Sequence, residues 1–153
     1  MGKDNDHAAT AKTGLAKNKA SVRETRAEKI LLAAQTLFAK QGFRRVTMEN
    51  IAQAAGIAKT TLYAYFSDKD VIFKAVAELT VSRMERDFLH ALAAKEPLVD
   101  RVSAALIAKH RVTFELVRSS EHAAELFATK NRLIGSLFSD MDKVLIHQTA
   151  NVI

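Results

Sequence analysis

The sequence contains no cysteine, a single proline and five glycines among its 153 residues. The absence of cysteine excludes a disulfide framework, a thiolate metal site and a cysteine nucleophile. Strands and hairpins depend on frequent glycine and proline breakers, which are scarce here. Because alanine, leucine, lysine, arginine and glutamate are plentiful instead, the composition predicts an all-α fold of one or two small domains.

Long apolar runs are also missing from the sequence. No stretch approaches the roughly 18 consecutive apolar residues of a membrane span. The first ten residues, MGKDNDHAAT, lack the apolar core of a secretory signal. We therefore expect a protein that does not insert into a membrane and that acts in the cytoplasm, which also fits the lack of cysteine.

Motifs typical of catalysis are missing as well. The sequence has no glycine-rich phosphate loop, no nucleophile elbow and no HExxH zinc motif. Glu121, His122 and Glu125 share a short stretch, and His122 and Glu125 stand three apart, as two metal ligands on one helix can, but the pattern supplies no third ligand for that pair. We therefore expect neither an enzyme nor a cofactor, and no metal site.

The excess of positive over negative charge is confined to the first part of the chain. The formal net charge is +6, with 12 Lys and Arg against 6 Asp and Glu in residues 1–69 and 11 of each kind in residues 70–153. A chance imbalance is the alternative explanation. Such segregation indicates a polyanionic partner for the first part, with nucleic acid favoured over a membrane.

The apolar pattern divides the chain into three parts. Residues 1–22 are polar, rich in lysine and without apolar periodicity, which predicts a flexible basic arm. Residues 23–69 are predicted to form a three-helix domain, and residues 70–153 a further helical region. The first helix is expected from about Arg23 to Gln41, and Gly42 suits the left-handed residue that ends many helices. The buried face of this helix follows from 3.6-residue spacing: Ile30, Ala33, Ala34, Leu37 and Phe38.

Two short helices are predicted next. Thr47 is a good N-cap for the second helix, and Gly56 ends it after about two turns. A third helix opens at about Ala58, with Leu62 and Phe66 four apart on its inner face.

The remaining sequence predicts longer helices. The fourth is capped by Ser67 or Asp68, the fifth begins at Pro97, and a break at 119–121 precedes one or two more. The buried side of the fifth helix is expected to contain Val102, Leu106, Ile107, Phe114 and Val117.

Two short helices joined by a glycine turn are typical of a helix-turn-helix, whose second helix enters the major groove. Lys59 and Thr60 lie in the first turn of that helix, where groove-reading residues of this motif lie. Tyr63 and Tyr65 offer hydroxyls on rigid rings to phosphates. Lys69, beside the first N–H groups of the next helix, is predicted to form an anion site.

Over residues 26–80 the sequence resembles the DNA-binding domain of the TetR family of transcriptional repressors. The resemblance rests on GFRRVTMENIAQAAG and on GIAKTTLYAYFSDKD running directly into VIF. It implies that the second helix start contacts phosphate, that the third helix reads the groove, and that the residues after it contact the DNA backbone or bases. The DNA-binding residues so implied are Thr47, Lys59, Thr60, Thr61, Tyr63, Tyr65 and Lys69.

The resemblance also implies how such a protein works. Its relatives act as homodimers in which each subunit reads half of a near-palindromic operator. Their C-terminal helices enclose a pocket for a small-molecule effector, and binding of that effector releases the DNA. A ligand-responsive repressor is therefore expected, with an effector that the sequence does not identify. Members of the family usually have more C-terminal helices, so residues 70–153 are expected to be an incomplete regulatory and dimerisation region.

A second interpretation stays open at the level of sequence. A helical interaction module with one basic surface, binding an acidic protein or a membrane, has the same charge distribution. It predicts binding to heparin or anionic vesicles without preference for a DNA duplex.

Overall fold

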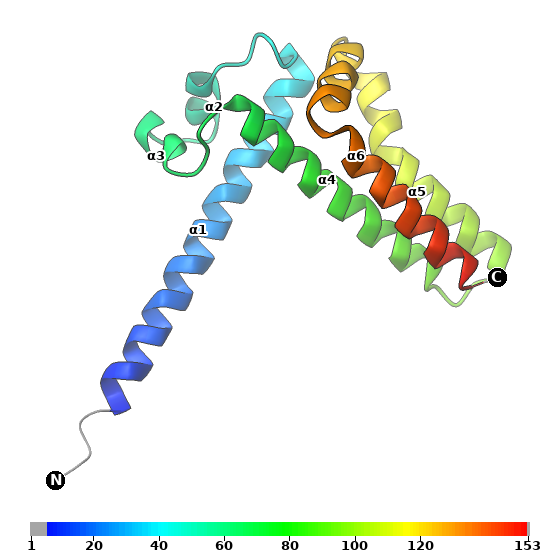
Figure 1. Ribbon diagram of the computed structural model, residues 1–153, viewed down its shortest axis with the longest axis horizontal. Coiled ribbons are helices and arrows are strands. Elements are labelled where there is room, and N and C mark those ends of the chain that lie inside the picture. The colour runs from blue at the N-terminus through cyan, green and yellow to red at the C-terminus, as the bar shows by residue number, and fades with distance from the viewer. Residues whose placement is uncertain (1–5, 153) are drawn as a thin grey trace.

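The computed structural model describes the backbone of residues 6–152 and the side chains of residues 24–118 and 120–152. This part of the chain forms six α-helices and no strand (Figure 1). The helices are α1 (Asp6–Gln41), α2 (Met48–Ala54), α3 (Lys59–Tyr63), α4 (Lys69–Leu92), α5 (Leu98–Ser119) and α6 (Ala123–Ala150). The predicted all-α fold is confirmed.

The first helix is longer than the apolar pattern predicts. It begins at Asp6 rather than at about Arg23, so residues 6–22 of the expected arm have helical backbone, and the flexibility of this arm stays a prediction. Residues 1–5 lie outside the described residues. The prediction relied on apolar periodicity, which reports a buried face. A segment rich in alanine and lysine and free of proline can continue a helix by propensity alone, without any buried face.

The first hydrophobic core lies where α1, α2, α3 and the start of α4 meet. The side chains of Ile30, Leu62 and Ile72 are completely buried there. The rings of Phe38, Phe43 and Phe73 have pairwise centroid separations of 5.2–5.5 Å and tilted or edge-on orientations. This core therefore holds the two short helices against the end of α1.

The second hydrophobic core lies along the rest of α4. Val81, Met84, Phe88 and Leu92 of α4 pack with a few side chains of the last two helices, namely Ala105, Met141 and Leu145. The helix α4 thus contributes to both cores and runs from the short helices to the far end of α5 and α6 (Figure 1). The division at residues 69 and 70 stays a prediction.

The predicted buried side of α5 is wrong for four of its five residues. Only Val102 packs against the second core, whereas Leu106, Ile107, Phe114 and Val117 are 48–68% exposed. The apolar spacing is genuine, but α4 and α6 cover a different side of α5, where Ala105 is fully buried. The result is an apolar outer face on this helix.

The break after α5 is confirmed, since α5 ends at Ser119 and α6 begins at Ala123. Pro97 is the N-cap of α5 rather than part of its first turn. Only one further helix follows in the described part, and it is kinked at Ile134 (φ −146°, ψ 32°), as Figure 1 shows. Among the described residues, none of these helices combines the length and the hydropathy that a bilayer crossing requires.

Candidate nucleic-acid interface

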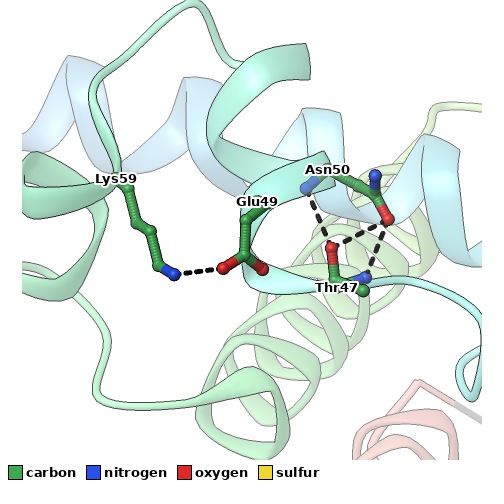
Figure 2. Close-up of polar contacts among 4 residues, drawn as sticks. All are labelled: Thr47, Glu49, Asn50 and Lys59. Carbon is green, nitrogen blue, oxygen red and sulfur yellow. Dashed lines mark hydrogen bonds and ion pairs between the residues drawn. The ribbon is translucent and has the colours of Figure 1, made fainter.

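The start of α2 is fixed by a reciprocal pair of side-chain contacts. Thr47 Oγ1 accepts a hydrogen bond from the backbone N–H of Asn50 at 3.1 Å, and the Thr47 N–H donates to Asn50 Oδ1 at 3.0 Å (Figure 2). This is a capping box with asparagine in place of the usual glutamate or glutamine. The N-cap predicted at Thr47 is confirmed, and its side chain is exposed at this corner of the molecule.

Two glycines with left-handed backbone end the helices α1 and α2. Gly42 (φ +77°) follows α1, and Gly56 (φ +66°) follows α2. The Gly42 N–H donates to the carbonyl of Phe38 at 2.9 Å, and the Ile57 N–H donates to the carbonyl of Ala52 at 3.0 Å. These bonds satisfy carbonyls that a helix end leaves open, so the chain reverses sharply at both places.

The helix α3 is short and has two chemically different sides. Leu62 is fully buried in the first core, which confirms the predicted inner face. Lys59 and Thr60 are exposed, Tyr63 is 46% exposed, and Thr61 is half-buried. An ammonium group, a hydroxyl and a phenol therefore share the outer surface of a helix that the core holds in place.

The turn after α3 differs from the prediction. The helix ends at Tyr63, so Tyr65 and Phe66 lie beyond it, although the Phe66 N–H still donates to the carbonyl of Leu62 at 3.0 Å. Both side chains are half-buried and pack against the first core. Tyr65 therefore contributes to packing as well as offering an edge to the surface, whereas Tyr63 is the more open of the two phenols.

Lys59 forms an ion pair with Glu49 that joins α3 to α2, as Figure 2 shows. Both side chains are about half exposed, and the Lys59 ammonium also lies 5.9 Å from the centre of the Tyr63 ring. The hydrogen bond from Lys59 lowers the pKa of Glu49, and the same bond raises the pKa of Lys59. Glu49 is therefore a member of this surface, although the sequence did not place it among the DNA-binding residues.

Lys69 binds the loop between α1 and α2. Its ammonium donates to the carbonyls of Phe43 and Val46 at 2.8 Å and of Arg44 at 3.3 Å. It also lies 4.5 Å from the centre of the Phe43 ring. Three acceptors can use the three N–H bonds of an ammonium, so the geometry gives Lys69 a positioning role in the loop between α1 and α2, and its phosphate contact stays a prediction.

The same loop is held from the other side by the start of α6. The Glu125 carboxylate accepts from the Arg44 N–H at 2.7 Å, and Ser120 Oγ donates to the carbonyl of Ala39 at 2.6 Å. A Cβ added at Gly42 would collide with the Glu125 carboxylate. The Arg44 N–H and the Glu125 carboxylate are 81 positions apart in the sequence. No sequence pattern predicted this contact.

A cavity of about 660 Å³ lies between α4, α5 and α6 and reaches the end of α1. Gln35, Phe38 and Ala39 of α1 belong to its wall. The cavity therefore touches both the first core and the C-terminal helices, although the sequence identified no ligand-binding residue.

Comparison with known proteins agrees with this geometry. Residues 30–76 match the family described as bacterial regulatory proteins, tetR family. This stretch covers the end of α1, the two short helices and the start of α4.

Individual relatives carry the same kind of name. An uncharacterized HTH-type transcriptional regulator of Mycobacterium tuberculosis is 28% identical over 122 residues, which cover 80% of this chain and 58% of that protein. The fatty acid metabolism regulator protein of Bacillus subtilis is 35% identical over 85 residues, covering 53% of this chain and 41% of that protein. The chain thus spans less than two thirds of the length of either of these two relatives.

The fold also has a counterpart among solved structures. The crystal structure of a candidate tetR family transcription regulator from Shewanella sp. PV-4 superposes with a TM-score of 0.53, covering 83% of this chain and 71% of that one. The sequence identity is 19%, so this similarity concerns the fold.

Proposed function

We propose that this chain, whose residues 30–76 match the family described as bacterial regulatory proteins, tetR family, is a regulator of that kind, which binds double-stranded DNA and regulates transcription rather than catalysing a reaction. The observation that carries this proposal is the outer surface of α3. Lys59, Thr60 and Tyr63 are exposed on a short helix whose opposite side is anchored by the fully buried Leu62. A helix held in this way can enter a major groove and present donors to base edges and phosphates.

The proposed DNA contacts fall into two groups. Lys59, Thr60, Thr61 and Tyr63 of α3 face the groove or its phosphates, and Thr47 adds a phosphate contact at the start of α2. Tyr65 contributes from the turn beyond α3. Lys69 acts indirectly in this proposal, because it orders the loop before Thr47 by binding three carbonyls.

The Lys59–Glu49 ion pair affects how this surface attracts phosphate. A phosphate approaching Lys59 competes with the Glu49 carboxylate for the same ammonium. Since both side chains are about half exposed, this pair contributes little to folding and can exchange partners readily. Glu49 therefore limits non-specific attraction to DNA, and binding depends on the complete set of α3 contacts.

We further propose that the protein acts as a homodimer on a near-palindromic operator and that a small molecule relieves repression. Support for the dimer comes from the outer face of α5, where Val99, Ile107 and Phe114 are 62–74% exposed. An exposed apolar surface of this kind is typical of a protein–protein contact. Two linked DNA-binding domains also bind an operator more tightly than one, because binding of the first raises the effective concentration of the second. The site of action is the cytoplasm, where bacterial DNA lies.

Support for a ligand response comes from the cavity and the junction beside it. The cavity wall includes Phe38 and Leu126, which also belong to the first core. A ligand that moves the start of α6 would disturb the bond from the Arg44 N–H to Glu125 and the bond from Ser120 to the Ala39 carbonyl. Both bonds hold the segment that leads into α2, so a change in the cavity reaches the helix pair α2 and α3 through direct contacts.

A salt-dependent DNA titration tests the proposed function. The protein is titrated with the duplex upstream of its own gene at two salt concentrations, beside the variants Tyr63→Ala and Lys143→Ala. We expect tight binding that weakens steeply with salt, a loss of about tenfold or more for Tyr63→Ala, and no change for Lys143→Ala, whose exposed side chain pairs with Asp140 far from α3 in the sequence.

Two results would count against the proposal. Equal binding of Tyr63→Ala and the unchanged protein would remove α3 from the interface. Binding to heparin or anionic vesicles with no preference for duplex DNA would favour the interaction module instead. The solution mass of the protein and of Phe114→Glu tests the dimer separately, because a charge at the centre of the α5 face is expected to halve the mass.

A further inference from the structure

The cavity between α4, α5 and α6 has a wall that is mostly apolar. Phe73, Val76 and Met84 of α4 face it together with side chains from the other helices, including Leu116, Phe138 and Met141. Its volume of about 660 Å³ lies within the range of small-molecule sites in proteins. An apolar body of matching shape would gain by leaving water for this space.

The charged side chains of the same wall are nearly all paired. Lys109 lies 2.8 Å from Asp142 across α5 and α6, and Arg111 lies 3.4 Å from Asp87 of α4. Glu115 pairs with Arg118 at 3.0 Å. These groups balance one another, so none of them requires a ligand for its charge.

Lys130 is the exception among the described lysines and arginines of the wall. Lys130 is half-buried as a residue, and its ammonium lies 4.5 Å from the centre of the Phe138 ring and 5.6 Å from that of Phe127. No carboxylate of the described residues is within ion-pair distance of it. Aromatic faces attract a cation, but they do not replace the hydrogen bonds that an ammonium makes with water or an anion.

From this arrangement we infer that the cavity binds an amphipathic monoanion, with its acidic group on Lys130 and its apolar body along the α4 wall. A carboxylate at Lys130 forms a charge-assisted hydrogen bond in surroundings of low polarity, where such bonds are strongest. A cationic ligand is disfavoured, because Asp142 is already neutralised by Lys109. This inference deepens the proposed function by giving the chemical class of the effector, and it rests on that proposal only for its regulatory meaning.

Binding of three ten-carbon probes to the purified full chain tests the inference. Decanoate, 1-decanol and decyltrimethylammonium differ in the charge of the head group and share the apolar chain, and calorimetric titration at neutral pH measures each. We expect decanoate to bind about tenfold more tightly than 1-decanol, and more tightly still than the cation. Lys130→Met keeps the aliphatic stem and is expected to remove that preference while leaving decanol affinity unchanged.

Two further variants serve as controls. Lys130→Arg keeps the positive charge and is expected to retain the preference for decanoate, and Lys143→Met removes a lysine that lies outside the cavity wall and is expected to change nothing. A circular-dichroism melt of each variant shows whether it is folded. Equal affinity for decanoate and decanol, preference for the cation, no binding of any probe, or an unchanged preference in Lys130→Met would each overturn the inference.

The DNA titration on the same preparation keeps the two proposals apart. If decanoate binding fails while salt-dependent duplex binding persists, the assigned ligand class is wrong and the proposed function stands. If duplex binding fails while Lys130-dependent decanoate binding persists, the cavity is an anion site in a protein of another function. If both hold, decanoate is expected to lower the DNA affinity of the unchanged protein and to have no such effect on Lys130→Met.

Discussion

The helices α3 and α5 expose opposite kinds of side chain. On α3 the apolar Leu62 is fully buried, and the exposed side carries a lysine, a threonine and a tyrosine. On α5 the small Ala105 is fully buried, and the exposed side carries Ile107 and Phe114. The first surface suits a polar, charged partner, whereas the second suits an apolar one. Exposure alone thus says little about a helix until the chemistry of its outer side is known.

The largest effect is expected from the anchor of α3. Leu62→Ala removes a side chain that is 0% exposed and leaves a cavity under the helix, so the free energy of unfolding is expected to fall by about 2–5 kcal/mol. Ile107→Ala, at a position 68% exposed on α5, is expected to change it by less than about 0.5 kcal/mol in dilute protein. Urea unfolding at low protein concentration measures both. A large loss for Ile107→Ala would mean that the α5 face is covered in solution.

A smaller effect is expected from the lysine that orders the first loop. Lys69→Met keeps the stem beside the Phe43 ring and leaves three carbonyls without their donor, which is expected to cost about 1–3 kcal/mol of folding free energy. Lys74→Met, on the exposed side of the same helix, is the matched control and is expected to be nearly neutral. Unchanged stability combined with weaker DNA binding would restore the direct phosphate contact that the sequence predicted for Lys69.

The two left-handed glycines offer a comparison across the junction with α6. Gly42→Ala and Gly56→Ala both force alanine into a left-handed backbone, at a cost of about 1–2 kcal/mol each. At Gly42 the new methyl also collides with the Glu125 carboxylate, whereas at Gly56 nothing lies within 4 Å. We expect Gly42→Ala to cost about 1 kcal/mol more, through the lost bond from the Arg44 N–H.

A double-mutant cycle sharpens this comparison. In a Glu125→Ala background the obstacle to the methyl group is absent, so the excess cost of Gly42→Ala over Gly56→Ala is expected to disappear. Chemical denaturation of the four variants measures it. An excess that survives in the Glu125→Ala background would place its cause in the backbone alone.

The smallest effect is expected from the cap that starts α4 and depends on pH. The hydrogen bond from the Val71 N–H, followed by that from the Ser67 hydroxyl, lowers the pKa of Asp68. A carboxyl whose folded-state pKa is lowered stabilises the fold above its unfolded value of about 3.9, and this contribution is lost as the pH falls through the folded-state pKa. The stability gap between the protein and Asp68→Ala is therefore expected to narrow in acid, as thermal melts at pH 7 and below pH 3 would measure. A gap that stays constant over this range would contradict the assignment.

The helix-turn-helix could be predicted from sequence because its signals are local. Thr47, Gly42 and Gly56 act within three or four residues of themselves, through caps and left-handed turns. The pattern that placed Leu62 inside is equally local. The start of α1 could not be found in this way, because the prediction looked for a buried face and helix propensity needs none.

The contacts between distant segments could not be predicted from sequence. The sequence predicted that Lys69 binds phosphate because it lies beside the first N–H groups of a helix, and only the fold brings the carbonyls of Phe43 and Val46 to it. The side of α5 that is buried depends in the same way on where α4 and α6 lie.

The sequence by itself determined an all-α chain with a helix-turn-helix motif and a basic N-terminal part. Composition indicates the helical class, and caps and periodicity are signals that extend over a few residues. The tertiary structure decided which charges are left without a partner. It gave Lys69 backbone carbonyls as hydrogen-bond acceptors, paired Lys109 with the Asp142 carboxylate, and left Lys130 among aromatic rings. The physical reason is that the interaction of a charge with its partner depends on a separation of a few ångströms. The spacing of residues along the chain does not fix the distances between side chains of separate helices.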